Sequence, residues 1–518
     1  MARLLVLVPG IQLRAGSWEP LIARLQNDSA WLPDTVISRW DHGTWVLGQK
    51  PLLLLAKHLA IHINTQWALH NGFDEVILAG HSMGALLIRQ AYLIGLGSTI
   101  NGMEPMLWAD HVSRIVLLAG VNRGLRLRWW EKLALPFLVS RHGTLRDLLV
   151  GSDFITNLRI WWLRKLKQIP KRPVVVQVLG KSDELVDRLD SLDIEGFDEG
   201  HQFLIDNAHH GDLFLPDKSG HFRPQQYEIL SLAILKPVAD EPSREVNYEA
   251  SQKIYFLVHG IRDSNNDWVA AMKELINQRI PGAVVIEPDI GRFSALQFLI
   301  PSQRRRYVRW FQDVYSRTMA KNPIASFNFV GHSYGTYLLG YGLRHLSGMH
   351  FDRVYLGGSV LPAEWDWDRH RAQVREVRNA CAVHDFPVGV LCSALRGLRI
   401  TDIGTAGYTG FRLAFSPESE LRYYEGGHGG SVSEAARPDI LGFLCDGFQY
   451  RRGALLKEDT GFTRVSAGAG IALPLLLAVY IFFLVTAFFY SPLHPAGLWL
   501  FLGLIAFVLV LAGITAFI

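Results

Sequence analysis

The chain has 518 residues, enough for roughly three domains of ordinary size. Hydrophobic residues make up 49% of it and the formal net charge is only +4, which excludes a disordered chain and a nucleic-acid-binding protein with a dominant basic field. The cysteines form no Cys-x-x-Cys pair, which excludes a disulfide-stabilised scaffold and indicates a reducing compartment; they are Cys381, Cys392 and Cys445.

The first predicted element is an apolar strand that ends in a glycine turn, Leu4–Gly10. A second apolar strand ends in the pattern Gly-His-Ser-Met-Gly around Ser82, and the run that follows it, ALLIRQAYLIGL, is compatible with a helix. A further strand is predicted over Arg114–Gly120. Strands that alternate with helical stretches at this pitch predict a parallel sheet covered on both faces.

The same series of features returns after a polar segment, residues 238–252, which we interpret as a linker between domains. Strand Ile254–Gly260 ends in a glycine turn, and a later strand ends in the same Gly-His-Ser-x-Gly pattern around Ser333. The turn glycine precedes the serine by 72 positions in the first half and by 73 in the second. This agreement predicts two domains of one fold, residues 1–237 and 253–450.

The end of the chain carries no charge, since no Asp, Glu, Lys or Arg follows Arg464. Within this tail, Ala472–Tyr490 and Ala496–Ile518 are each long enough to cross a hydrocarbon core about 30 Å thick. We expect residues 466–518 to form a transmembrane helical hairpin, because in lipid the backbone must satisfy its own hydrogen bonds. A soluble core helix would normally show a charged outer face instead.

The segment before the hairpin, residues 451–465, is basic, whereas the predicted turn between the helices has no Lys or Arg. The positive-inside rule therefore predicts a multi-pass membrane protein whose large domains are cytoplasmic. The basic residues are Arg451, Arg452, Lys457 and Arg464.

The two Gly-x-Ser-x-Gly patterns predict nucleophiles at Ser82 and Ser333. A serine on a tight strand-to-helix turn projects its hydroxyl over the carboxyl edge of the sheet, and glycine two residues to either side leaves the room that the turn needs. The N-terminus of the following helix adds a positive dipole near a developing oxyanion. Two such patterns, each at a strand-to-helix junction, are a specific signal.

On these elbows both halves resemble α/β-hydrolase domains, so the chain resembles a tandem serine esterase or lipase-like protein with a C-terminal transmembrane hairpin. The resemblance implies an oxyanion hole made by two backbone N–H groups, one in the turn after the early strand and one directly after the nucleophile. These belong to Ile11 and Met83 in the first half and to Ile261 and Tyr334 in the second. The first half departs from the family's usual His-Gly turn, because it has Pro9 before the glycine.

A serine hydroxyl needs an imidazole to accept its proton and a carboxylate to hold that imidazole. The resemblance implies the order Ser, acid, His along the chain. In the first half, Asp183 matches the family's acid loop and His210 matches the spacing of its late histidine loop. Alternatives remain, Glu184 and Asp187 for the acid and His209 and His221 for the histidine.

In the second half, Asp385 follows a predicted strand, and His428 lies among four glycines, where the backbone can bring an imidazole close to the elbow. We expect no metal and no cofactor, since the 19 histidines include no His-Glu-x-x-His motif and no paired Cys-His spacing.

The halves differ in the segment between the strand after the elbow and the acid, which is 63 positions long in the first half and 27 in the second. We interpret the extra piece as a cap at about residues 121–170. Its tryptophans stand among Arg and Lys, as at a lipid headgroup boundary, although packing over the cap's own pocket would bury them equally well. They are Trp129, Trp130, Trp161 and Trp162. The stretches GVNRG and LVGSDFITNL in this piece are similar to the corresponding parts of triacylglycerol-lipase and GPI-inositol-deacylase-like hydrolases, and this resemblance implies an ester with an apolar acyl chain.

The sequence therefore predicts a membrane-anchored serine hydrolase that cleaves carboxylic esters through an acyl-enzyme at one or both sites. The expected partners are a small-molecule or lipid ester and membrane lipids, and no nucleic acid. The alternatives are an acyltransferase, which uses the same intermediate, and a membrane-tethered interaction protein whose hydrolase folds are non-catalytic binding modules.

Overall fold

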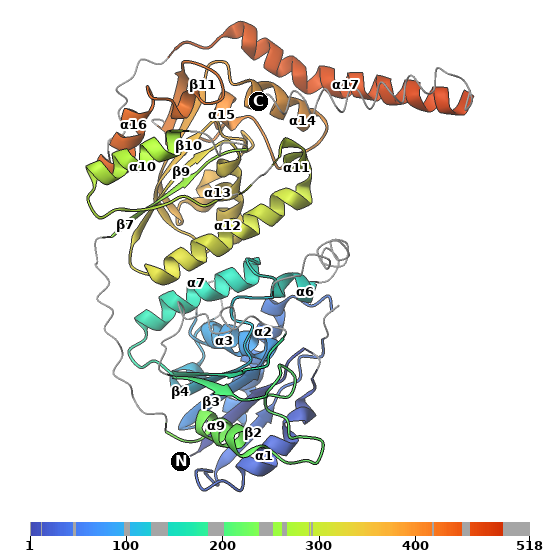
Figure 1. Cartoon of the computed structure of the whole chain (residues 1–518), viewed down its shortest axis with the longest axis vertical. Coiled ribbons are helices and arrows are strands. Elements are labelled where there is room, and N and C mark those ends of the chain that lie inside the picture. The colour runs from blue at the N-terminus through green and yellow to red at the C-terminus, as the bar shows by residue number, and fades with distance from the viewer. Residues whose placement is uncertain are drawn as a thin grey trace. The chain divides into compact units, whose positions relative to one another are not determined.

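The computed structural model describes most of the chain, and Figure 1 shows its course. The described residues are 2–11, 13–44, 48–97, 104–125, 143–184, 201–237, 252–261, 267–289, 291, 294–416, 419–447 and 456–490. The chain divides into two compact units. The first is Met1–Tyr248 with Gln312–Pro323 and Leu346–Gly348, and the second is the rest of the chain. Most of the predicted linker, residues 238–251, lies outside the described part.

The first unit is built on a six-stranded parallel sheet. Its order is β2 (Thr35–Arg39), β1 (Arg3–Val8), β3 (Glu75–His81), β4 (Val112–Leu118), β5 (Val174–Gly180) and β6 (Gln202–Ile205). All six residues of β1 are buried, as expected for a strand covered on both faces. Since β1 and β3 are neighbours, with Val8 beside Gly80, the segments that leave their carboxyl ends meet at one edge of the sheet.

Helices cover both faces of this sheet (Figure 1). One face carries an apolar cluster with α2 (Leu52–Leu69), α3 (Met83–Gly95) and α7 (Asp153–Gln168). The opposite face packs against α1 (Glu19–Leu25) and α9 (Pro224–Ile234). Every residue of α3 is buried, because this helix lies between the sheet and its neighbours α2 and α7.

The second unit repeats this sheet. Its parallel strands run in the order β8 (Val284–Ile286), β7 (Lys253–Val258), β9 (Ser326–His332), β10 (Phe351–Gly357), β11 (Val374–Ala382) and β12 (Glu420–Tyr424). The order matches that of the first sheet strand for strand, with β7 and β9 in the places of β1 and β3. Both units thus show the parallel sheet and helical layers of α/β-hydrolase folds.

The helices of the second unit also cover both faces. α10 (Asp267–Arg279) and α16 (Arg437–Leu441) pack on one face. α13 (Tyr334–His345) follows β9, and the preceding α12 (Pro301–Lys321) contributes Phe311 to a cluster of phenylalanines on β7 and β9. The second unit also contains the short helices α11 (Ala295–Leu299), α14 (Ser393–Gly397) and α15 (Ala406–Thr409).

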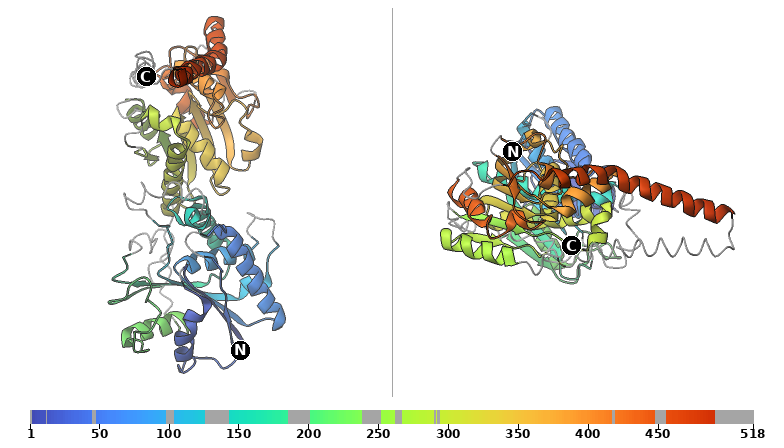
Figure 2. Two further views of the ribbon diagram at one scale, coloured as in Figure 1. Left: turned by 90° about the vertical axis from the view of Figure 1, so that its right-hand side faces the viewer. Right: turned by 90° about the horizontal axis from the view of Figure 1, so that it is seen from above.

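The last described element is α17 (Thr460–Tyr490), which projects from the second unit in Figures 1 and 2. Among the described residues, one helix is long and apolar enough to cross a membrane, and it is this one, over Thr460–Phe483. The predicted second span, residues 496–518, and the turn before it lie outside the described residues. The structure therefore supplies one candidate span, and the hairpin stays a prediction.

Candidate active sites at two serine elbows

The first site begins where β3 ends and α3 begins. Ser82 stands between them with φ 53° and ψ −116°, a conformation that a non-glycine residue adopts only when the surrounding structure enforces it. Its N–H donates to the carbonyl oxygen of Leu118 at 2.8 Å. Gly84 explains the motif, because a Cβ there would overlap the carbonyl oxygen of Val8. The elbow can thus press against β1 only if this position lacks a side chain.

His210 lies between the serine and the acid of the first unit. Its Nε2 is 2.8 Å from Ser82 Oγ, and its Nδ1 is 2.8 Å from Asp183 Oδ2. A carboxylate only accepts, so Nδ1 carries the proton and Nε2 is left to accept the serine hydroxyl proton. The side chains of Asp183 and His210 are 7% and 12% exposed, which shields this hydrogen-bonded chain from most solvent.

Two loops at the carboxyl edge of the sheet carry these groups. Asp183 follows β5 and His210 lies in the loop after β6, and the loops are joined where Ser182 N–H donates to the carbonyl oxygen of Ala208 at 3.1 Å. Gly180 permits this approach, because a Cβ there would overlap the same carbonyl. The backbone therefore holds the acid beside the imidazole.

The alternatives considered for this half lie elsewhere. His209 is exposed, and its N–H donates to Asp212. His221 is exposed and bonds to its own loop through Ser219 and Asp217. Glu184 is also exposed, and Asp187 lies outside the described residues.

A third histidine supports the first site. His81, the residue before Ser82, donates from Nε2 to the backbone carbonyl oxygen of His210 at 2.7 Å. Its ring is 2% exposed, and burial is the main reason that the pKa of His81 falls to about 3. The ring is therefore neutral at ordinary pH, and its single N–H is committed to holding the loop of His210.

The second unit repeats the elbow. Ser333 has φ 54°, and its N–H donates to the carbonyl oxygen of Gly357 at 2.9 Å. A Cβ at Gly335 would overlap the carbonyl oxygen of Val258, as at Gly84 in the first unit. Both serines are largely buried, with 8% exposure at Ser82 and 7% at Ser333.

The acid and histidine of the second unit also form a pair. His428 Nδ1 lies 2.9 and 3.0 Å from the two carboxylate oxygens of Asp385, which is fully buried and also accepts the N–H of Val388. His332, which precedes Ser333, donates from Nε2 to the carbonyl oxygen of His428 at 3.0 Å. The supporting histidine is thus present in both units, and the repeated Gly-His-Ser-x-Gly pattern was its signal in the sequence.

The turns proposed to supply oxyanion-hole N–H groups lie beside the elbows. A Cβ on Gly10 would be 3.1 Å from the Cβ of Ser82, so the turn that contains Ile11 runs alongside the nucleophile. Met83 is the first residue of α3 and Tyr334 the first of α13. Ile261 follows Gly260 in the turn after β7.

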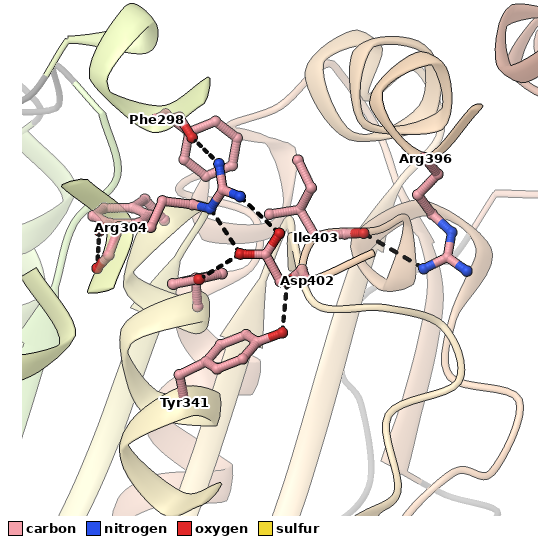
Figure 3. Close-up of polar contacts among 8 residues, drawn as sticks. Phe298, Arg304, Tyr341, Arg396, Asp402 and Ile403 are labelled. Atoms are coloured by element: carbon pink, nitrogen blue, oxygen red, sulfur yellow. Dashed lines mark hydrogen bonds and ion pairs between the residues drawn. The ribbon is translucent and has the colours of Figure 1, made fainter. Parts of the chain in front are cut away.

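Figure 3 shows the ion pair between Arg304, whose side chain is fully buried, and Asp402, whose side chain is 28% exposed. Arg304 on α12 is fully buried and bonds to both carboxylate oxygens of Asp402, at 2.9 and 2.7 Å, and to the carbonyl of Phe298. Tyr337 donates to the same carboxylate at 2.8 Å, and Tyr334 donates to the carbonyl of Arg304 at 3.2 Å. The helix that begins directly after Ser333 is thereby tied to α12 and to the loop of Asp402.

The cap tryptophans that the structure describes serve packing. Trp162 on α7 is fully buried, with the Arg89 guanidinium 4.7 Å above its ring and Tyr92 at its edge. Trp161 is half-buried, and Trp129 and Trp130 lie outside the described residues. A lipid-facing role therefore does not apply to Trp162.

Among the described residues, no group of three His, Cys, Asp or Glu side chains gathers as a metal site would require. The polar groups beside the two elbow serines are instead one aspartate and one histidine in each unit, Asp183 with His210 and Asp385 with His428.

No family model matches the chain, and no curated protein sequence matches it. Solved structures match parts of it. A monoacylglycerol lipase from Paleococcus ferrophilus is 15% identical with a TM-score of 0.31, over 44% of this chain and 92% of that one. Phospholipase PlaB from Legionella pneumophila is 17% identical with a TM-score of 0.27, over 38% of this chain and 43% of that one.

The peroxisomal α/β-hydrolase Lpx1 from Saccharomyces cerevisiae is 12% identical with a TM-score of 0.29, over 46% of this chain and 79% of that one. Each of these alignments covers less than half of this chain. Sequence identities this low show the fold alone, so the function is inferred from the geometry around Ser82 and Ser333.

Proposed function

We propose that the chain is a serine hydrolase that cleaves carboxylic esters at Ser82 through an acyl-enzyme, with a second site of the same kind at Ser333. The observation that carries the proposal is the hydrogen-bonded chain from Asp183 through His210 to Ser82, with both distances at 2.8 Å. This arrangement provides a nucleophile, a general base and the group that orients the base.

The proposed reaction starts when Ser82 Oγ attacks the ester carbonyl carbon and His210 Nε2 takes the hydroxyl proton. Asp183 stabilises the resulting imidazolium, which has Nδ1–H directed at its carboxylate. The negative oxygen of the tetrahedral intermediate is bound by the N–H groups assigned to Ile11 and Met83, the latter at the positive end of α3. Collapse expels the alcohol, which takes the proton from His210.

Deacylation uses the same groups, with water in the place of the serine hydroxyl and Ser82 as the leaving group. Water attacks the acyl carbon while His210 accepts its proton, and the carboxylic acid leaves as Ser82 recovers a proton. An alcohol in place of water would make the step an acyl transfer. The ratio of acid to transesterified product in the presence of added alcohol therefore distinguishes hydrolysis from transfer.

We further propose that α17 anchors the chain in a membrane and that the substrate is a lipid ester. Support comes from the length of the apolar segment and from the exposure of its large side chains, such as 66% for Phe482 and 64% for Leu476. The basic residues before the helix support domains on the cytoplasmic side. Protease digestion of sealed vesicles tests this orientation, since cleavage near residue 245 only from the opposite side would contradict it.

The enzymatic proposal is tested with p-nitrophenyl esters of increasing acyl length and with the Ser82→Ala, Ser333→Ala and double variants in detergent. A burst of nitrophenol followed by slower turnover is expected when deacylation limits the rate. Loss of turnover in the double variant, with single variants that each retain one site, supports two active elbows. Equal turnover in wild type and double variant would refute the proposal.

A further inference from the structure

One buried histidine of the first unit lies far in the sequence from both Gly-His-Ser-x-Gly motifs. His42, which follows β2, is 3% exposed, and its Nε2 lies 3.1 Å from the carbonyl oxygen of Gly10. The same carbonyl accepts the N–H of Leu13 at 3.0 Å. Two donors therefore converge on the turn that runs alongside Ser82.

The surroundings of His42 define its tautomer. The N–H of Thr44 donates to His42 Nδ1 at 3.2 Å, so Nδ1 is an acceptor and Nε2 carries the proton that is donated to Gly10. Burial is the main cause that lowers the pKa of His42, and the nearby Lys50 adds to the lowering, whereas the hydrogen bond to Gly10 and the charge of Asp41 raise this pKa.

The carbonyl of Gly10 and the N–H of Ile11 belong to one peptide plane, in which they point in opposite directions. Hydrogen bonds that fix and polarise the carbonyl therefore also fix and polarise the N–H. This N–H is the one assigned to the oxyanion hole, where a small error in direction weakens stabilisation of the transition state.

The second unit holds the equivalent carbonyl in another way. There the carbonyl oxygen of Gly260 lies 2.8 Å from Nδ1 of His259, the residue directly before it. The first unit has Pro9 at that place, which has no side-chain donor. We infer that His42 is a positioning residue for the first oxyanion hole and replaces from β2 the donor that His259 supplies in the second unit. This inference rests on the proposed function.

The test uses full-length protein that carries Ser333→Ala, so that the first site alone is measured. We expect His42→Ala to lower kcat for a short p-nitrophenyl ester by at least about tenfold with KM changed less than about twofold, because the lost effect is confined to the transition state. His42→Gln, whose amide can donate to Gly10, should recover part of kcat. Reaction with a fluorophosphonate, whose adduct places an oxygen in the same hole, should slow in parallel.

His62→Ala is the matched control, because His62 bonds to Ser38 of β2 at 2.7 Å, whereas His42 bonds to Gly10 in the turn after β1. Equal kcat in the His42→Ala and His62→Ala variants would overturn the inference, as would a loss of activity that follows only from a lower Tm. If the Ser333→Ala protein shows no turnover and no label at Ser82, the proposed function of the first site fails instead.

The helix α17 contacts the second unit over its first turns and then leaves it. The first turns of α17 are packed against that unit, since Tyr408 and Thr463 hydroxyls are 2.7 Å apart and Ser466 donates to the carbonyl of Gly389. Farther along, a Cβ on Gly397 of α14 would meet Pro474 at 2.7 Å. The helix is therefore docked on the domain as far as Pro474.

Beyond Pro474 the large aliphatic and phenylalanine side chains of α17 that the structure describes are exposed, with 59% at Leu475 and 50% at Val479. Figures 1 and 2 show this part projecting away from the domain. If the projecting part enters hydrocarbon, the end of α14 lies at the level of the membrane surface, because Gly397 contacts the helix at Pro474.

Two exposed residues follow α14 directly and two more follow α15, and we name these four residues the exit patch: Leu398, Arg399, Arg412 and Leu413. The two parts of the patch are joined by Glu364, which bonds to Arg396 of α14 at 3.1 Å and to Arg412 at 3.3 Å. Leu398 and Leu413 are 38% and 59% exposed, so both present apolar surface to their surroundings.

We propose that the exit patch contacts the surface of the bilayer that α17 spans, with its leucines in the acyl boundary and its arginines at anionic headgroups. Leucine beside arginine is the composition that binds this boundary. The inference rests on the proposed membrane anchor.

The test places a single fluorescent label at residue 398, 413, 479 or 278 of the full chain, in vesicles that contain phosphatidylglycerol and brominated phosphatidylcholine. The three cysteines are buried and do not compete for the label. Labels at 398 and 413 should be quenched by the bromine atoms, and the label at exposed Gln278 of α10 should not. Arg399→Glu with Arg412→Glu should weaken the quenching at 413.

Quenching at 398 and 413 no greater than at 278 would overturn the proposal. Protection of these labels from aqueous iodide without quenching by brominated lipid would also overturn it, since a second protein copy would then cover the patch. The label at Val479 reports on the anchor itself, and its failure to be quenched would refute the membrane span.

Discussion

His81 donates from Nε2 to the backbone carbonyl oxygen of His210 at 2.7 Å, so the residue before the nucleophile holds the loop of the proposed general base. His332 and His428 repeat the relationship at 3.0 Å. The elbow of each unit therefore fixes both the serine and the histidine that would activate it, and a change on either side of this bond is expected to disturb both.

Stability should depend on pH through His81. Burial lowers the pKa of His81 to about 3, whereas the unfolded chain protonates this ring below its ordinary pKa of about 6.5. The neutral His81 ring makes its full contribution to the free energy of unfolding above about pH 6.5. This contribution is lost as the pH falls toward 3, at a limiting slope of about 1.4 kcal/mol per pH unit. His81→Gln, which keeps an N–H donor and cannot titrate, should flatten the fall in the free energy of unfolding between pH 6.5 and 4.

Urea unfolding of the first unit, followed at several pH values, measures this slope. His221→Gln is the control, because His221 is exposed and should leave the slope unchanged. Identical slopes for wild type and His81→Gln would contradict the assignment of a neutral buried ring.

Asp183→Asn should abolish most turnover at the first site. The amide has nearly the same shape, but its NH₂ group facing Nδ1 would favour the tautomer in which Nε2 carries the proton and cannot accept from Ser82. In the Ser333→Ala background we expect kcat to fall by about 10⁴-fold, with KM little changed. Steady-state kinetics of the ester series checks this, and a loss below about tenfold would argue against Asp183 as the acid.

Gly84→Ala should destabilise the first unit. Its Cβ would overlap the carbonyl oxygen of Val8, and the nearest atoms all belong to the backbone of Val8 and Pro9, which leaves little room for relaxation. We expect a loss of about 1–3 kcal/mol, seen as a lower Tm. Gly16→Ala has nothing within 4 Å of the new Cβ and serves as the control. Equal Tm values for the two variants would contradict the close contact between the elbow and β1.

Asp402→Ala should destabilise the second unit through Arg304. The variant leaves a fully buried guanidinium without its carboxylate, a change that typically costs about 3–5 kcal/mol. Asp368→Ala removes the partner of Arg371 from an exposed pair, with 52% and 69% exposed side chains, and should cost less than about 1 kcal/mol. Thermal unfolding compares the two variants, and equal losses would mean that the buried pair does not brace the elbow.

The sequence predicted those features of the fold and site that follow a hydrophobic pattern or a short motif. Alternation of apolar strands and helices predicted two parallel sheets, and the Gly-His-Ser-x-Gly patterns placed Ser82 and Ser333 at the two strand-to-helix junctions where the structure has them. The family resemblance favoured His210 over His209 and His221, and the surrounding glycines favoured His428; the structure pairs His210 with Asp183 and His428 with Asp385.

Other features depend on tertiary packing and have no local pattern. His42 reaches Gly10 only because β2 pairs with β1, and its contact cannot be read from spacing. The helix α12 before the second elbow carries Arg304, whose partner Asp402 is 98 positions away. The tryptophans and arginines of the cap are typical both of a lipid headgroup boundary and of packing inside the protein. Trp162 is buried under Arg89, so at this residue the role is packing.

The most direct test of the central claim is labelling of the full-length protein in detergent with a fluorophosphonate, followed by mass spectrometry of the labelled peptides. The account predicts a covalent adduct on Ser82 and on Ser333, with the adduct at each site lost in the matching serine-to-alanine variant. The absence of any adduct on both serines, under conditions in which a control serine hydrolase is fully labelled, would contradict it.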